Sequence, residues 1–141
     1  MVKDNVLYSI DKKILLKSGK QDGTINVIDG VETVKEKAFA ESGVQKIIFP
    51  ASLKNIEKEM FLNCKNLKKI QISSSNSYMT VVDGAIYSKN KGKLLSAGVA
   101  KGTFKLLKKT IKIQRCAFAG NETVKKVVIT GRMKKLEKEG F

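Results

Sequence analysis

Residues 30–73 read GVETVKEKAFAESGVQKIIFP and then ASLKNIEKEMFLNCKNLKKIQIS, which are two copies of one unit. Phe39 and Phe61 hold the same place in the two copies and lie 22 residues apart. The other apolar positions recur in step: Val34 with Ile56, Val44 with Leu67, Ile47 with Ile70, and Phe49 with Ile72. A repeat of this length is typical of a solenoid, in which each unit buries its apolar face against its neighbours.

A larger duplication surrounds these repeats. Residues 4–61 and 83–141 are copies of one module, and residues 62–82 hold the end of a repeat and a linker. Leu7-Tyr8 aligns with Ile86-Tyr87, and after one inserted residue Phe61 aligns with Phe141. We therefore expect residues 1–141 to form a single solenoid built from a duplicated module.

Each module is predicted to open with a β-meander, because short apolar runs alternate with glycine-containing turns. The predicted meander strands are 6–9, 13–16 and 24–28 in the first module, and 79–82, 85–88, 93–96 and 103–107 in the second. The repeats that follow should each contain an extended segment, a short helical turn and a strand. Those strands are predicted at 44–49, 67–72 and 124–129, stacked in parallel at about 4.8 Å.

The Ala-Phe and Met-Phe pairs are placed on the short helical turns. Their phenylalanines should stack into a spine of rings inside the solenoid, formed by Phe39, Phe61, Phe118 and Phe141. Tyr8 and Tyr87 repeat at one module position, so we expect both to be packing residues.

The pattern resembles the BspA-type leucine-rich repeat family. Residues 56–72, IEKEMFLNCKNLKKIQI, are similar to the repeat signature I-x-x-x-A-F-x-x-C-x-x-L-x-x-I-x-I-P, although Met60 and Gly140 replace its usual alanine. The segment VVDGAIYS at 81–88, followed by LLSAG at 94–98, resembles the β-hairpin insertion of such arrays.

This resemblance implies an α/β leucine-rich-repeat solenoid dominated by β-structure. It also implies a surface or secreted protein of a host-associated bacterium or parasitic protist that binds proteins or adheres through its sheet face. The family supplies no catalytic residues. The first ten residues carry no signal peptide, because they lack a basic stretch followed by an apolar one.

Several kinds of active site are excluded. The chain has no histidine, which removes serine–histidine and cysteine–histidine nucleophiles and histidine metal sites. No glycine spacing fits a dinucleotide fingerprint or a phosphate-binding loop. The carboxylate pairs Glu57/Glu59 and Glu137/Glu139 lie among lysines and are interpreted as a solvated charged face. We therefore predict no enzyme activity, no metal and no cofactor.

Two cysteines are too few for a disulfide scaffold. Cys64 and Cys116 occupy different repeat positions, so we expect two free thiols. Cys64 should be buried and Cys116, which aligns with Lys37 and Glu59, should lie nearer the surface.

The net charge is +15, and 26 of the 28 basic residues are lysine. Residues 71–141 carry +11 of that charge and residues 1–70 carry +4. Sequence-specific nucleic-acid readers rely on arginine forks, so no specific nucleic acid is expected. The lysines are either ordinary surface residues or a diffuse attractor of an anionic partner.

The candidate binding face consists of the outward residues of the repeat strands. These are Gln45, Lys46, Ile48, Lys68, Lys69, Gln71, Lys125, Lys126 and Val128. A protein ligand, such as a host extracellular or surface protein, is the expected partner, with an anionic glycan as another possibility and no membrane insertion. The alternatives are a structural spacer or stalk, and a charge-driven binder of glycan or nucleic acid. A specific binder, unlike a spacer, should present aromatic or apolar outward residues on this face, and Ile48 and Val128 are the only such candidates on the repeat strands.

The chain ends at the position equivalent to Phe61, so we expect a fragment of a longer array. Its core would be open around Met133, Leu136 and Phe141, with fraying after about Gly131 or self-association through this end.

Overall fold

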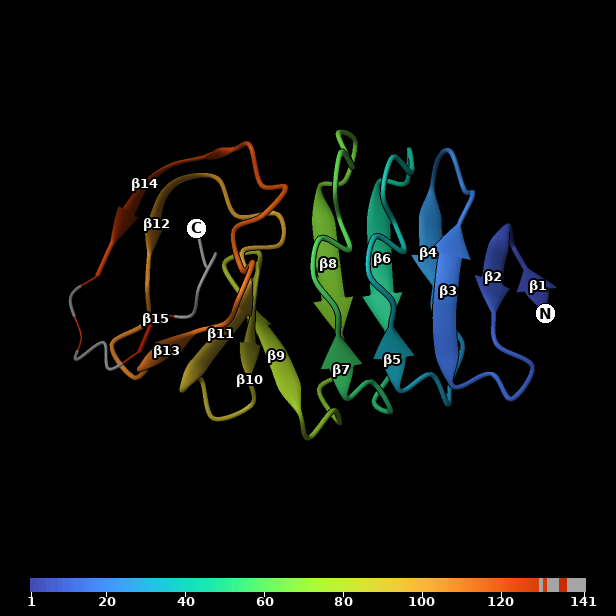
Figure 1. Ribbon diagram of the computed structural model, residues 1–141, viewed down its shortest axis with the longest axis horizontal. Coiled ribbons are helices and arrows are strands. Elements are labelled where there is room, and N and C mark those ends of the chain that lie inside the picture. Colours follow the sequence, from blue (N-terminus) through green and yellow to red (C-terminus); the bar gives the residue numbers. More distant parts are fainter. Residues whose placement is uncertain (130, 132–134, 137–141) are drawn as a thin grey trace.

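The structure is a computed structural model that covers residues 1–141 and describes residues 1–129, 131 and 135–136. Within that part, the chain forms fifteen strands and no helix, arranged as an elongated solenoid (Figure 1). None of the described residues forms a helix with the length and apolarity needed to cross a membrane. The strands are β1 (Val2–Lys3), β2 (Val6–Tyr8), β3 (Ile14–Ser18), β4 (Thr24–Asn26), β5 (Thr33–Val34), β6 (Lys46–Phe49), β7 (Asn55–Ile56), β8 (Lys69–Ile72), β9 (Met79–Val82), β10 (Ala85–Ser88), β11 (Lys93–Ser96), β12 (Gly102–Lys105), β13 (Lys112–Ile113), β14 (Val124–Val128) and β15 (Lys135–Leu136).

The chain coils in rungs, and each rung gives one strand to each of two sheets. Residues 1–72, which we count from here on as the first module together with its repeat end, form two sheets of the orders β1-β2-β3-β5-β7 and β4-β6-β8. In the second module they are β9-β10-β11-β13-β15 and β12-β14. We number the rungs by their strand pairs: rung 1 (β3, β4), rung 2 (β5, β6), rung 3 (β7, β8), rung 4 (β11, β12) and rung 5 (β13, β14).

The two modules share irregularities as well as strands. The β2–β3 pairing shifts register between Leu7 and Tyr8, and the β10–β11 pairing shifts between Ile86 and Tyr87, the aligned positions. Neither sheet of the first module continues into the second, since β7 and β8 share no sheet with β9 or β12. We call this boundary between rungs 3 and 4 the joint.

The core runs between the two sheets in two clusters. The first is centred on fully buried Phe39, Ile47 and Phe49, and the second on Tyr87 and Leu94. Tyr8 is only 2% exposed and Tyr87 only 1%, which confirms the prediction that both are packing residues. The predicted strands are all present, although most are a residue or two shorter than the apolar pattern indicated.

The predicted helical turns are tight non-helical corners. We call residues 36–42, 58–64 and 115–121 the long corners of rungs 2, 3 and 5. In the first, backbone bonds join Lys35 to Ala38 and Lys37 to Ala40, while Lys37 and Glu41 have φ of 58° and 62°. A right-handed helix cannot contain such residues. The equivalent residues of the other long corners also have positive φ: Glu59, Asn63, Cys116 and Gly120.

The predicted spine of rings is interrupted. Phe39 and Phe61 stack with their centroids 5.8 Å apart and an interplanar angle of 20°. Among the described residues Phe61 makes no ring contact with Phe118, which instead packs edge-on against Phe104 at 5.4 Å. The spine stops at the joint because rung 4 has a short corner, residues 97–101, without a phenylalanine.

The prediction for the two cysteines was wrong in their relative burial. As predicted, neither forms a disulfide, but Cys116 is buried, with 8% exposure, and Cys64 is only partly buried. Alignment with Lys37 and Glu59 suggested an exposed position for Cys116. The cysteine side chain is much shorter than those of lysine and glutamate, so at the same position it does not extend to the surface.

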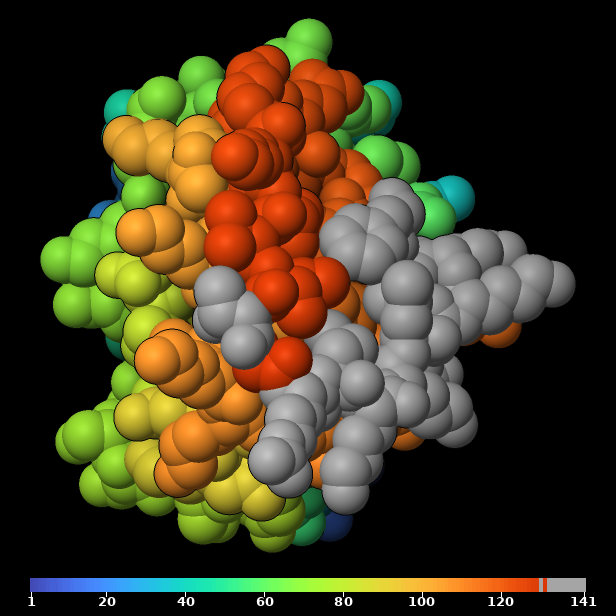
Figure 2. All heavy atoms as spheres, turned by 90° about the vertical axis from the view of Figure 1, so that its left-hand side faces the viewer, coloured from blue at the N-terminus to red at the C-terminus, as the bar shows by residue number. Residues whose placement is uncertain are grey.

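The predictions made for the C-terminal end fall on Met133, Leu136, Glu137, Glu139 and Phe141. The side chains of these residues lie outside the described part of the structure. Figure 2 views the molecule from the end that carries β14, whose residues cross the middle of that face.

Candidate binding site

The outer surface of β4, β6 and β8 carries the first six residues of the predicted binding face. Parallel pairing places Lys46 beside Lys69 and Ile48 beside Gln71. Ile47 and Phe49, which alternate with these residues along β6, are fully buried. Gln45 and Lys68 precede the strands and are linked by a bond from the Lys68 amide to the Gln45 carbonyl. The structure therefore brings six of the nine predicted residues together.

The other three predicted residues lie on a separate sheet. Lys125, Lys126 and Val128 belong to β14, which pairs with β12 so that Val128 lies beside Lys105. The joint separates that sheet from β8. The outer residues of the two modules thus form two faces rather than one.

A shallow hollow of about 560 Å³ lies at the end of the first face. Ile48, partly buried, lines it together with Asn26 and Ile28. Lys3 and Asp29 are also in the lining, so both signs of charge border an apolar centre.

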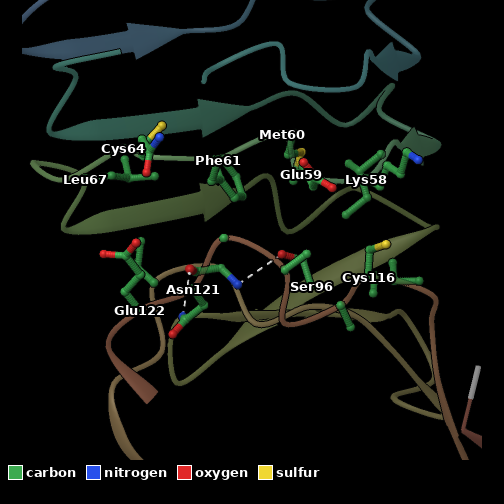
Figure 3. A pocket seen from close by; sticks show the side chains of 18 of the residues that line it. Lys58, Glu59, Met60, Phe61, Cys64, Leu67, Ser96, Cys116, Asn121 and Glu122 are labelled. Atoms are coloured by element: carbon green, nitrogen blue, oxygen red, sulfur yellow. Dashed lines mark hydrogen bonds between the residues drawn. The ribbon is translucent and has the colours of Figure 1, made fainter. Parts of the chain in front are cut away.

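A second depression lies at the joint, where no site was predicted. It is a cleft of about 290 Å³ between the long corner of rung 3 and the long corner of rung 5 (Figure 3). Its apolar lining includes Met60, Phe61 and Leu67 on one wall and Val99 and Ala117 on the other. The short corner of rung 4 forms its base, because residues 97–101 do not reach as far out as a long corner.

Two glycines bring the walls of the cleft together at its edges. A Cβ atom on Gly98 would lie 3.2 Å from Cδ1 of Ile70, which is on the other side of the joint. A Cβ atom on Gly120 would lie 3.3 Å from Cα of Leu62. The rungs are thus in contact at both places, and the cleft is the space left between them.

Cys64 is the titratable group of the cleft with a perturbed pKa. Burial raises the pKa of its thiol to about 11, against smaller lowering effects from the Ser42 backbone and Lys17. Its Sγ donates to the Phe39 carbonyl at 2.7 Å. A protonated, hydrogen-bonded thiol is a poor nucleophile, so this residue is structural.

Asn121 connects the backbone segments of one wall of the cleft through its side-chain hydrogen bonds. Its side-chain nitrogen donates to the carbonyls of Gly98 and Ala100, and its oxygen accepts from the amides of Thr123 and Val124. In the glycosylation sequon Asn121-Glu122-Thr123, the side chains of Asn121 and Thr123 are therefore both hydrogen-bonded to the backbone of the fold. No group of three or more potential metal ligands occurs in the described part of the chain.

A signal for the cleft was present in the alignment of the modules. Lys17 and Lys20 of the first module are replaced by Ser96 and Val99 in the second. Both replacements line the cleft.

Comparisons with known proteins agree with this architecture. Residues 7–91 match the family model described as BspA type Leucine rich repeat region (6 copies). No curated protein matches the chain significantly.

Three solved structures share the fold. A leucine-rich repeat protein from Eubacterium ventriosum aligns with 24% identity and a TM-score of 0.75, over 88% of this chain and 34% of its own. The pneumococcal vaccine antigen PcpA aligns with 19% identity and a TM-score of 0.61, over 84% of this chain and 36% of its own. A leucine-rich cell surface protein from Faecalibacterium prausnitzii aligns with 12% identity and a TM-score of 0.51, over all of this chain and 45% of its own. The chain thus spans about a third to a half of the length of these structures.

Proposed function

The chain belongs to the BspA-type leucine-rich repeat family, and from that premise we propose that it is a non-enzymatic protein-binding module. It takes a protein ligand on the outer face of β4, β6 and β8, and it acts at a bacterial cell surface or after secretion. The location is supported by the solved relatives, one of which is described as a cell surface protein.

The hollow at Ile48 is the observation that carries this proposal. It combines the partly buried aliphatic side chain of Ile48 with the polar group of Asn26, its neighbour in register on β4. Contacts of this composition favour protein ligands, whose interfaces have an apolar centre and a polar rim. A pure spacer has no need for such a depression on its sheet face.

Ile48→Gln tests the proposal with little risk to the fold, because Gln71 already occupies the equivalent position on β8. Capture of host extracellular proteins by the immobilised chain should fall at least about tenfold, as loss of a central apolar contact predicts. Ile10→Gln is the matched control, since Ile10 is 93% exposed and is not part of the lining of the hollow. Equal losses in both variants, or none in either, would contradict the assignment.

Charge-driven binding of an anionic glycan is the second candidate. It is favoured by Lys46 and Lys69, which are adjacent in register and therefore repel each other unless solvated or neutralised by an anion. Retention on heparin resin should then fall steeply with salt, and Lys68→Glu with Lys69→Glu should reduce it further. Retention that ignores both changes leaves the lysines as surface residues only.

A further inference from the structure

The long corners of rungs 2 and 3 are joined by a short hydrogen-bond ladder. The amides of Lys37, Phe39 and Glu41 donate to the carbonyls of Lys58, Met60 and Leu62 at 3.4, 2.9 and 2.8 Å. The positive φ at Lys37 and Glu41 orients alternate amides toward the next rung. Each long corner therefore presents a row of donors on the side that faces its successor.

Rung 3 presents the same row with no acceptor opposite. Glu59 and Asn63 repeat the positive φ of Lys37 and Glu41, at 55° and 56°. The amides of Glu59, Phe61 and Asn63 make no hydrogen bond within the described part of the chain, and all three residues line the cleft. A row of unpaired amides attracts carbonyl and carboxylate oxygens.

The opposite wall offers an acceptor in the same cleft. In the first module, Nζ of Lys17 donates to the carbonyls of Lys37 and Ala40 on the long corner of rung 2. Ser96 replaces Lys17 in the second module, and its hydroxyl bonds instead to the Gly98 amide at 3.0 Å. The carbonyl of Ala119, equivalent to that of Ala40, accepts no hydrogen bond in the described part of the structure.

The column of rings also has an open place at the cleft. Phe61 stacks on Phe39 through one face, while its other side borders the cleft (Figure 3). An aromatic side chain placed there would continue the stack. Pairs of this kind contribute about 0.5–1.5 kcal/mol beyond the area that they bury.

Charge at the cleft indicates the composition of the occupant. Basic side chains outnumber acidic ones in the lining, and the whole chain carries +15. A peptide with acidic residues beside its aromatic one therefore complements both the amide row and the rim. The charged lining residues are Lys58, Lys65, Lys68, Lys101 and Arg115 against Glu57, Glu59 and Glu122.

We propose that the cleft binds a short peptide segment of a partner protein, which inserts as the long corner that rung 4 lacks. Its alternate carbonyls accept from the amides of Glu59, Phe61 and Asn63, one of its amides donates to Ala119, and its aromatic side chain stacks on Phe61. This site is separate from the β4–β6–β8 face and goes beyond the function proposed above. It is peptide recognition by addition of backbone to an unpaired edge, with a side-chain pocket for specificity.

The probe is the heptapeptide acetyl-EKAFAES-amide, which copies residues 36–42 and thus has the sequence of a long corner with two glutamates. Titrated into the full chain, it should bind with a dissociation constant of about 1 mM or tighter. The amide resonances of Glu59, Phe61 and Asn63 should shift and become protected from exchange. The same peptide with alanine for phenylalanine should bind about tenfold more weakly.

Ser96→Lys with Val99→Lys restores the residues of the first module and should close the cleft. Lys17 and Lys20 occupy the equivalent positions in the first module, where Lys20 pairs with Asp4 at 2.8 Å, so this backbone accepts lysine at both places. Because Val99 packs against the first core cluster, a urea titration checks that the variant remains folded. Peptide affinity should fall at least tenfold although two positive charges are added. The control, Ser77→Lys with Ile111→Lys, adds the same charge at exposed positions outside the cleft and should not weaken binding.

The two proposals fail separately. Ile48→Gln should leave heptapeptide binding unchanged, and Ser96→Lys with Val99→Lys should leave capture of ligand on the sheet face unchanged. No binding to the wild-type chain, no response of the three amides, or equal affinity for the alanine peptide would overturn the peptide site. A concentration-dependent dimer that the lysine pair abolishes, without peptide binding, would identify a second copy as occupant and overturn it as well.

Discussion

The junction between rungs 2 and 3 and the joint between rungs 3 and 4 begin from long corners of the same backbone conformation and end differently. At the first junction, three backbone bonds and the stacked rings of Phe39 and Phe61 close the interface. At the joint, the same edge of rung 3 faces a short corner, and a cleft of about 290 Å³ remains. A repeat thus determines the conformation of its own corner, whereas the rung that follows it determines whether the amides of that corner find hydrogen-bond acceptors.

Ion pairs follow the same division. Three of them connect rung 2 with rung 3: Lys35–Glu57, Lys54–Glu32 and Lys58–Glu36, at 3.6, 3.6 and 3.7 Å. The joint has no ion pair among the described residues. It is held instead by the close approach of Gly120 to the Leu62 backbone and of Gly98 to the Ile70 side chain, and by apolar contacts such as Val99 with the first core cluster.

Replacing the two stacked rings should give the largest contrast between the junctions. Phe39 is fully buried between Phe49 and Phe61, so Phe39→Ala should cost about 4 kcal/mol of unfolding free energy in urea titrations. Phe61→Ala removes a ring that borders the cleft and should cost about half as much. Equal costs for the two variants would mean that the joint is as tightly packed as the junction.

Asn76 tests how the linker is attached to rung 3. Its buried amide donates to the carbonyls of Pro50 and Leu53 and accepts from the amides of Tyr78 and Met79. Asn76→Ala leaves several of these groups unpaired and should cost about 3 kcal/mol. Ser77→Ala is the matched control, because Ser77 is exposed, and it should be neutral in the same urea titration.

Much of the fold was predictable because apolar spacing determines it. The 22-residue period identified the repeating unit, and the offset alignment placed Tyr8 and Tyr87 in the core, where they are found. Parallel stacking of Lys46 beside Lys69 followed from the same alignment. These features depend on local pattern and on burial, which the sequence displays directly.

The joint was not predicted because it arises from the absence of a long corner in rung 4. Two modules that align over nearly all their length suggested one continuous sheet and one column of rings. The short corner of rung 4 and the replacement of Lys17 by Ser96 are visible in the alignment, yet their effect is spatial. Corner conformation was also missed, since Lys37 and Glu59 adopt positive φ without the glycine that usually signals it.

Thiol chemistry should report the burial of Cys64 beside the cleft. Since burial raises its pKa to about 11, the thiolate is scarce at neutral pH and alkylation by iodoacetamide should be much slower than in the urea-unfolded chain. The rate at Cys64 should rise steadily as pH approaches 11. Protonation in the folded state contributes stability below the thiol's ordinary pKa of 9.0, and that contribution is lost as pH rises toward 11. Cys64→Ser leaves Cys116 as the one thiol and so serves as the control that assigns the signal, whereas rapid modification of Cys64 at pH 7 would contradict a shielded thiol.

The smallest effect is expected from the three ion pairs between rungs 2 and 3. Their partners are largely exposed, so each pair should contribute no more than about 0.5 kcal/mol in low salt. Glu32→Gln with Glu36→Gln removes two of them and should lower the unfolding free energy by less than about 1 kcal/mol, an effect that 1 M salt should abolish. Glu122→Gln is a matched control, because Glu122 is an exposed carboxylate at the joint and forms no ion pair among the described residues. A salt-resistant loss above 2 kcal/mol in the double variant would show that charge, in addition to the backbone ladder and the ring stack, distinguishes the closed junction from the open joint.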